Sequence, residues 1–286
     1  MDTDTQRTLA GTFRDRHTKS ESGPLVLPNS WDAASTIIYE AAGFDAVGTS
    51  SAGIAAALGA PDGEHLSREE MLTVVDRIAH SVAIPVSADI EAGYGATPQT
   101  VAETVRRTID AGAVGVNLED GAIPGSGLVE RDRHVERIRA ARDAATEAGV
   151  PVVINGRTDV FWRDIGPAAT RVERAVDRAN AYLAAGSDCA FVPGVTDPTT
   201  IEALVDGIHG PVNVLGGPEA PSVPTLAELG VARVSVGSGP MRATLGLLRA
   251  ISEELRADGT YERMEAAIPY DELHELLAAS AGPRDS

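Results

Sequence analysis

The fold of this chain is decided by the stretch IPVSADIEAGYGATPQTVAETVRRTIDAGAVGVNLED, residues 84–120. Short apolar runs open and close it, and the segment between them repeats its apolar residues at the 3.6-residue spacing of an amphipathic helix. That segment ends with Ala111-Gly112, and glycine is the residue expected where a helix stops before a strand. The stretch therefore predicts a strand, a helix and a second strand parallel to the first.

The same alternation of strand and helix continues along the whole chain. Eight apolar runs with β-branched residues recur at fairly even spacing, at residues 25–29, 45–50, 84–89, 114–119, 150–155, 189–194, 211–216 and 232–237. Strict alternation indicates a parallel sheet, and eight units indicate that the sheet closes. We therefore predict the α/β class and a (β/α)8 TIM barrel.

Two segments lie outside the eight units. A helix is predicted over residues 5–18, where it would cover the bottom of the barrel, and a long helix after the eighth strand is followed by shorter ones near 260–266 and 270–280. A barrel takes about 250 residues, so the 286 residues suffice for one barrel with these additions. We predict a single domain over 1–286 with a helical extension over about 258–286.

Composition excludes several functions. The 24 basic and 42 acidic residues give a net charge of −18, which argues against nucleic acid as a partner. No run approaches the roughly 18 apolar residues of a membrane span, and the polar N-terminus lacks a signal peptide's apolar segment, so we expect a cytoplasmic protein without a membrane partner. The only lysine, Lys19, lies far from any strand end, which excludes a Schiff-base nucleophile. The only cysteine, Cys189, opens an apolar run and is predicted to be a buried thiol.

Charged residues gather at three strand ends. Asp89 and Glu91 follow one strand, Glu119 ends the next, and Arg157 and Asp159 end a third. Residues just past the strands of a barrel converge on one mouth, and an extended strand would point Asp89 and Glu91 to the same side. Several carboxylates there suit Mg²⁺ or Mn²⁺, and an arginine suits an anionic substrate. The alternative is that the carboxylates cap helices or pair with arginines, and that Arg157 forms an ion pair with Asp159 or Glu119.

Other residues are expected at the same mouth. Ser30 is predicted to cap the helix that starts near Asp32, and Trp31 to line the pocket or its rim. Asp62 lies on a Gly/Pro-rich loop that can reach the mouth. Backbone N–H groups suited to a carboxylate, or simply a turn that needs small residues, are expected after the second strand at Ser50, Ser51 and Ala52.

These motifs together resemble the isocitrate lyase/phosphoenolpyruvate mutase superfamily, from about residue 8 to 280. The segment LPNSWDAASTIIYEAAGFDAVGTSSAGIA (27–55) resembles its opening strand–helix–strand. SADIEAGYG (87–95) resembles its D-x-D-x-G-Y-G metal motif, with Glu91 in place of the second aspartate. NLED (117–120) and the arginine of INGRTD (154–159) match as well.

The resemblance implies roles for these residues. Asp89 would ligate Mg²⁺, or Mn²⁺, with Glu91 and Glu119 ligating directly or through water. Arg157 would bind carboxylate or phosphonate oxygens of a small-molecule oxo or hydroxy acid, and Asp62 would lie near the departing group. Its 2-oxo or 2-hydroxy carboxylate would be held by Ser50, Ser51 and Ala52. The resemblance also implies a homotetramer that exchanges a C-terminal helix between subunits, which would bury the apolar residues Leu273, Leu276 and Leu277.

The chain departs from the family after Glu119. Isocitrate and methylisocitrate lyases carry K-[KR]-C-G-H there, and phosphoenolpyruvate mutases carry E-D-K-x-x-x-K-x-N-S. This chain reads EDGAIPGSGLVERDRH (119–134), without Cys, Lys or Asn. The leading hypothesis is a Mg²⁺-dependent carbon–carbon lyase that acts through an enolpyruvate-like intermediate, with Tyr94 and Asp62 as unranked candidates for the acid. The alternatives are a phosphonopyruvate-type mutase or hydrolase, an oxaloacetate decarboxylase, or a non-catalytic barrel that binds an oxo acid.

Overall fold

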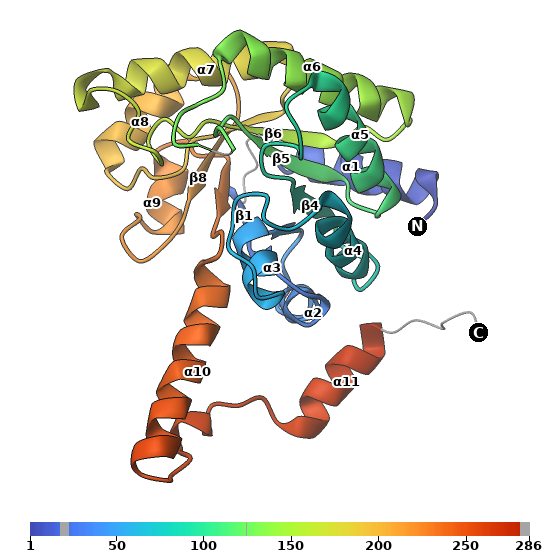
Figure 1. Ribbon diagram of the computed structural model, residues 1–286, viewed down its shortest axis with the longest axis vertical. Helices are drawn as coiled ribbons and strands as arrows, with labels where there is room; N and C mark the ends of the chain where they lie inside the picture. Colours follow the sequence, from blue (N-terminus) through green and yellow to red (C-terminus); the bar gives the residue numbers. More distant parts are fainter. Residues whose placement is uncertain (18–22, 124, 281–286) are drawn as a thin grey trace.

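The computed structural model describes residues 1–17, 23–123 and 125–280, so Lys19 lies outside the described residues. Parallel strands form one sheet in the order β1-β9-β8-β7-β6-β5-β4-β3-β2, ringed by helices (Figure 1). In the described ranges the strands are β1 Leu25–Leu27, β2 Asn29–Ser30, β3 Val47–Thr49, β4 Val86–Asp89, β5 Gly115–Glu119, β6 Val153–Arg157, β7 Cys189–Phe191, β8 Val212–Leu215 and β9 Arg233–Ser235. The predicted TIM barrel is confirmed, and each of the eight predicted runs contains a strand.

The ninth strand arises because Pro28 divides the first predicted run into β1 and β2. Proline has no N–H to donate to a sheet ladder, so pairing changes sides at this residue. Before it, Leu25 is in register with Arg233 of β9, and after it, Asn29 is in register with Gly48 of β3. The two short strands thus join the last strand to the rest of the sheet and close the barrel.

The helices follow the strands as predicted. Within the described residues they are α1 Thr3–Asp15, α2 Ala33–Ala41, α3 Ser51–Ala57, α4 Arg68–Ala79, α5 Pro98–Asp110, α6 Arg131–Glu147, α7 Arg171–Ala185, α8 Pro198–Gly207, α9 Val223–Glu228, α10 Gly239–Ala257 and α11 Tyr270–Ser280, with 3₁₀ turns at Ala168–Thr170 and Glu262–Met264. Gly112 follows α5 with a φ of 92°, which a glycine adopts without strain.

Ser30 was wrongly predicted to cap α2, because Asp32 is the cap and accepts a hydrogen bond from the Ser35 N–H. Ser30 instead lies buried in β2.

The bottom of the barrel is closed by α1, as predicted. Its Phe13 is fully buried and packs with Leu25, Leu27, Ala46 and Val153. At the same depth Cys189 is a buried free thiol, and burial raises its pKa to about 12. The prediction of an inert buried cysteine is therefore confirmed.

The C-terminal helices leave the barrel. Helix α10 runs away from the strands, and α11 returns from its far end (Figure 1) and contacts α2. Along α10 several leucines face solvent in this single chain: Leu245, Leu247, Leu248 and Leu255. Across the described ranges, no helix is both long enough and apolar enough to cross a membrane.

The buried histidine of α6 predicts how stability depends on pH. Burial, assisted by the charges of Arg137 and Arg178, lowers the pKa of His134 to about 3, against about 6.5 in the unfolded chain. Above pH 6.5 His134 is neutral in both states and does not change the free energy of unfolding. Below pH 6.5 the free energy of unfolding decreases as the pH falls, because the unfolded state then binds one proton more than the native state. Substituting His134→Phe, which keeps a ring beside Tyr182, should reduce the slope of unfolding free energy between pH 6 and 4 by about 1.4 kcal/mol per pH unit. Urea unfolding at several pH values measures the slope, and an unchanged slope would contradict the assignment; exposed His209→Gln is the control.

Candidate active site

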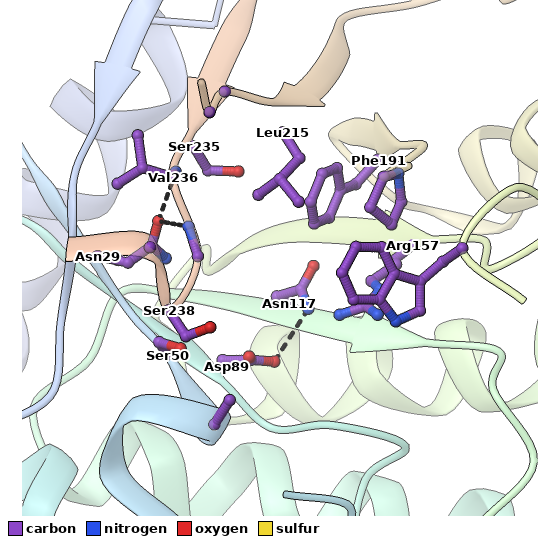
Figure 2. A pocket seen from close by; sticks show the side chains of 18 of the residues that line it. Asn29, Ser50, Asp89, Asn117, Arg157, Phe191, Leu215, Ser235, Val236 and Ser238 are labelled. Carbon is purple, nitrogen blue, oxygen red and sulfur yellow. Dashed lines mark hydrogen bonds between the residues drawn. The ribbon is translucent and has the colours of Figure 1, made fainter. Parts of the chain in front are cut away.

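A pocket of about 600 Å³ opens at the carboxyl ends of the strands (Figure 2). Six of the predicted site residues line it: Ser50, Ser51, Ala52, Asp62, Asp89 and Arg157. Four others do not: Trp31, Glu91, Tyr94 and Glu119. Trp31 packs instead against the apolar cluster that contains Ile54 and Met71. The structure therefore divides the predicted set into residues that face the pocket and residues that lie behind it.

Asp89 ends β4 at the centre of the pocket wall. One carboxylate oxygen accepts a hydrogen bond from the Ser51 N–H at 3.1 Å, and the other accepts one from Asn117 Nδ2 at 3.0 Å (Figure 2). Its own N–H donates to Thr49 Oγ1 at 2.9 Å. The carboxylate is thus fixed by the first residue of α3 and by β5, and the backbone by β3, so its remaining lone pairs are free to face the pocket.

Glu91 does not share the face of Asp89, contrary to the expectation of an extended strand. Strand β4 ends at Asp89, and Glu91 adopts a left-handed φ of 51°. Its carboxylate accepts hydrogen bonds from the Glu64 N–H at 2.6 Å and from the Tyr94 hydroxyl at 3.1 Å, while Glu64 accepts one from the Tyr94 N–H at 2.8 Å. Burial and the charge of Asp89 raise the pKa of Glu91 to about 7. Glu91 and Tyr94 thus fasten the loop that carries Asp62 to the end of β4.

Arg157 both forms ion pairs with acidic residues and lines the pocket, the two roles that the sequence leaves open. It stands opposite Glu119 on the neighbouring strand, and its Nη1 lies 2.9 Å from that carboxylate. Its Nε donates to Asp159 at 2.6 Å, and Nη2 has no hydrogen-bond partner among the described residues. Two aromatic rings, Trp162 and Phe191, lie 5.9 and 5.7 Å from the guanidinium carbon. Arg157 is therefore held on one side by acids and rings and presents its other side to the pocket.

The pKa values of Glu119 and Arg157 are both raised, for opposite reasons. Burial raises the pKa of Glu119 to about 8, although the charge of Arg157 opposes the rise. Burial works to lower the pKa of Arg157, but Glu119, Asp159 and Asp89 together raise it. The arginine accordingly stays charged at every physiological pH, and it carries the local positive field in an acidic protein.

Behind the pair lies a layer of buried hydrogen bonds. Asp120 is fully buried and accepts from the hydroxyls of Thr158 and Tyr182 at 2.7 and 2.6 Å and from the Asp159 N–H at 2.8 Å. Arg163 donates to Asp159 and to carbonyl oxygens of the loop after β5. This layer orients Asp159, and through it Arg157.

A row of amides was not predicted. Asn117 stands beside Asp89 on β5, and Asn155 stands beside Asn117 on β6. Asn155 Nδ2 donates a hydrogen bond to Asn117 Oδ1 at 3.0 Å, and Asn117 Nδ2 in turn donates one to the Asp89 carboxylate. Both asparagines line the pocket. Their signal in the sequence is a polar residue within an apolar strand run, VGVNLE and VPVVIN.

The carboxylates of the mouth suit a hard divalent cation. The charge of Asp89 raises the pKa of Asp62, of Glu91 and of Glu119, in each case after the larger effect of burial. Such mutual repulsion between oxygen ligands is relieved by a cation. Within the described residues, no three acidic, histidine or cysteine side chains are grouped so that they could hold an ion by themselves. The donor set therefore fits an ion that keeps several waters, as Mg²⁺ commonly does, rather than one enclosed by protein side chains.

Comparisons with known proteins extend over the whole barrel. Residues 13–256 match the family model described as phosphoenolpyruvate phosphomutase. The chain is 30% identical over 279 residues to the 2-methylisocitrate lyase of Escherichia coli, which covers 93% of this chain and 90% of the relative. It is 30% identical over 290 residues to the phosphoenolpyruvate phosphomutase of Streptomyces hygroscopicus, covering 96% and 90%. The crystal structure of a Burkholderia cenocepacia protein described as a lyase or mutase superposes with a TM-score of 0.89 at 37% identity, covering 99% and 100%.

Proposed function

Since the chain belongs to the phosphoenolpyruvate phosphomutase family, in the isocitrate lyase/phosphoenolpyruvate mutase superfamily, we propose that it is a carbon–carbon lyase for a small 2-oxo or 2-hydroxy di- or tricarboxylate. One observation carries the proposal: Arg157, locked by Glu119 and Asp159, faces the same pocket as the carboxylate of Asp89. A cation beside an anion is what recognition of an acid substrate with a divalent metal requires.

The pocket residues have separate tasks in this proposal. Arg157 binds one carboxylate of the substrate through Nη2, and the small residues Ser50, Ser51 and Ala52 leave room for the 2-oxo acid end. In a 2-oxo acid, the bond between carbons 3 and 4 breaks, and its electron pair forms the enolate of a pyruvate-like fragment. Carbon 4 leaves as carbon dioxide or, where it carries a hydroxyl that gives up its proton, as a carbonyl compound, and carbon 3 then takes a proton. In a 2-hydroxy acid, the hydroxyl gives up its proton, the bond between carbons 2 and 3 breaks to release the 2-oxo fragment, and carbon 3 of the other fragment keeps the electron pair and takes a proton.

Asp62 is the proposed proton donor and acceptor. It lines the pocket, and burial and the charge of Asp89 raise its pKa, as suits a carboxyl that exchanges protons with a substrate. Tyr94 does not line the pocket, and its hydroxyl is engaged by Glu91. We therefore assign Tyr94 a positioning role through Glu91 and the loop of Asp62.

A divalent cation, Mg²⁺ or Mn²⁺, is proposed to be held by Asp89, with Glu91 and Glu119 acting through water. When bound, it would stabilise negative charge on the 2-oxo oxygen. Asp89 is aimed by Asn117 and Ser51, so this chain supplies a ligand whose direction is fixed before the substrate enters.

The second candidate is breakage of a carbon–phosphorus bond by a mutase or hydrolase. The phosphoenolpyruvate phosphomutase of Streptomyces hygroscopicus favours it, but the loop after Glu119 offers no lysine or asparagine side chain to a migrating phosphoryl group. Two alternatives remain: oxaloacetate decarboxylation, and a barrel that binds an oxo acid without catalysing a reaction. Neither requires a hydrogen-bond donor from the loop after Glu119.

One panel of substrates separates these functions. The protein is incubated with oxaloacetate, methylisocitrate, isocitrate, 2,3-dimethylmalate and phosphonopyruvate, each with and without Mg²⁺, and the release of 2-oxo acid, carbon dioxide and phosphate is followed. We expect Mg²⁺-dependent 2-oxo acid from one of the hydroxy or oxo acids. Phosphate from phosphonopyruvate would replace the lyase with the second candidate, and tight binding of every acid without turnover would leave the non-catalytic barrel.

We also propose a homotetramer assembled through the C-terminal helices. Leu245 and Leu248 of α10 are 48% and 57% exposed in the single chain, an arrangement that favours burial by another subunit. The double substitution Leu245→Glu/Leu248→Glu should shift sedimentation from tetramer to smaller species. Leu58→Glu, which changes a leucine 52% exposed at the end of α3, is the control. A wild-type monomer in sedimentation would overturn this proposal.

A further inference from the structure

The pocket continues below the mouth into the barrel, where polar side chains replace the usual apolar layers. Ser87, Asn155 and Arg233 line it there, and each is at least nine-tenths buried. Barrel interiors are ordinarily filled by branched apolar residues, so this polar layer calls for a reason. We refer to these three residues together with Asn213, the neighbour of Arg233 on β8, as the inner cluster.

Arg233 is a buried cation that forms no ion pair with an acidic side chain of the described residues, although the charge of Asp89 acts on it from within the same pocket. Its Nε and Nη1 are buried and have no hydrogen-bond partner among the described residues. The guanidinium carbon lies 5.8 Å from the centre of the Phe13 ring, which supports it from below. Nearby, Cys189 is a thiol at neutral pH and His17 is a neutral imidazole, since their pKa values are about 12 and about 4. A lone buried charge is strongly unfavourable, so an ordered partner is expected.

The other members of the inner cluster also have free hydrogen-bonding atoms. Ser87 Oγ, Asn213 Nδ2 and Asn155 Oδ1 are buried and lack partners in the described part of the chain. Ser87 lies in the same region as the Phe13 ring: a Cβ built on Gly115 would lie 2.7 Å from a Phe13 ring carbon and 2.9 Å from Ser87 Oγ. Four of the five unpaired atoms can donate a hydrogen bond, and the only charge among them is positive.

We propose that the inner cluster is an anion-binding site, with Arg233 as its cation and a small monovalent anion as its ligand. A halide ion and a single carboxylate group share the required chemistry, because both accept several hydrogen bonds from a convergent set of donors. The source is either a free ion or one end of a bound acid. The proposal does not rest on the proposed reaction, because bromide binding tests it directly; the inner cluster and the reaction site share one pocket, and Asn155 connects them through Asn117 to Asp89.

The experiment uses sodium bromide as the probe. Crystals of the wild-type protein soaked in bromide should show an anomalous peak beside Arg233. In solution, bromide should raise the melting temperature by a few degrees more than sodium gluconate at the same ionic strength, since only an ion that binds the native state stabilises it. Arg233→Gln should abolish this difference.

Arg137→Gln is the matched control. Arg137 is 5% exposed against 3% for Arg233, and its Nε and Nη1 likewise lack partners among the described residues, but it lies on α6 outside the pocket. The control should keep the bromide effect. If Arg233→Gln does not fold, the anomalous map and the comparison of bromide with gluconate on the wild type still decide.

Oxalate distinguishes the two sources of the anion. If a bound acid supplies it, calorimetry should show that bromide competes with oxalate and that Arg233→Gln weakens oxalate binding at least tenfold. If a free ion supplies it, oxalate binding is indifferent to bromide and to the substitution while the bromide effects persist. Both results support the site. No anomalous peak, equal effects of bromide and gluconate, and unchanged oxalate binding would together overturn it in favour of water.

Discussion

Asp89→Asn should lower kcat/KM by about 10³-fold with little loss of stability. Loss of the cation that Asp89 is proposed to hold removes an electrostatic contact to the reacting oxygen, and one such contact is typically worth about 10²–10³-fold. Asparagine fills the same volume and keeps an oxygen for the N–H of Ser51 or the amide of Asn117. What it removes is the negative charge that we expect to hold the divalent cation. Calorimetric titration with Mg²⁺ in the presence of the substrate identified by the panel should show the loss of metal binding directly.

The control for this variant is Asp197→Asn. Asp197 caps α8 at the surface, where asparagine caps equally well, so kinetics and Mg²⁺ binding should be unchanged. Undiminished activity of Asp89→Asn would remove Asp89 from the metal site. Loss of activity with intact Mg²⁺ binding would instead assign the ion to other ligands.

Arg157→Met should reduce both activity and stability. Activity falls by at least about 10²-fold because the substrate carboxylate loses its partner. The free energy of unfolding falls by about 3–5 kcal/mol, because Glu119 and Asp159 remain buried beside an apolar side chain. Kinetics and urea unfolding measure the two effects separately.

A double variant separates these two losses. Arg157→Met/Glu119→Gln removes one of the two stranded charges, so part of the stability should return while activity does not. If activity returned with stability, Arg157 would be only a structural partner of Glu119, the alternative that the sequence alone leaves open. If neither returned, Asp159 would account for the whole penalty.

The barrel could be predicted from the sequence because its strands are buried on both faces. Such strands appear as short apolar runs, and their ends must converge whatever the details of packing. On that ground Asp89 and Arg157 were expected at the mouth, and Asp62 was expected there because of its Gly/Pro-rich loop; all three line the pocket. The division of the first strand was missed, although Pro28 within the run is its signal.

Sequence spacing could not give the direction of Glu91. Its left-handed backbone is stabilised by a bond from Glu64, which lies 27 residues earlier on another loop. The inner cluster was missed for a similar reason. Asn155, Asn213 and Arg233 are isolated polar letters in three separate runs. Strand register pairs Asn213 with Arg233, and the closed sheet brings Asn155 to the pocket that Arg233 lines. Contacts between distant segments decide both features, and neither feature produces a periodic pattern in the local sequence.

The break at Pro28 also bears on how the chain reaches its native state. The Asn29 side chain accepts bonds from the N–H groups of Val236 and Gly237, more than 200 positions away, and donates to Thr49 on the opposite side of the break. Pairing of such distant segments carries a large loop-closure cost and is intrinsically slow. Strand β1 therefore waits for β9, and a chain emerging from the ribosome cannot complete its ring until nearly five-sixths of it has been synthesised. Until then the edges of β1 and β8 are unprotected, which makes this interval the one in which chaperones matter most.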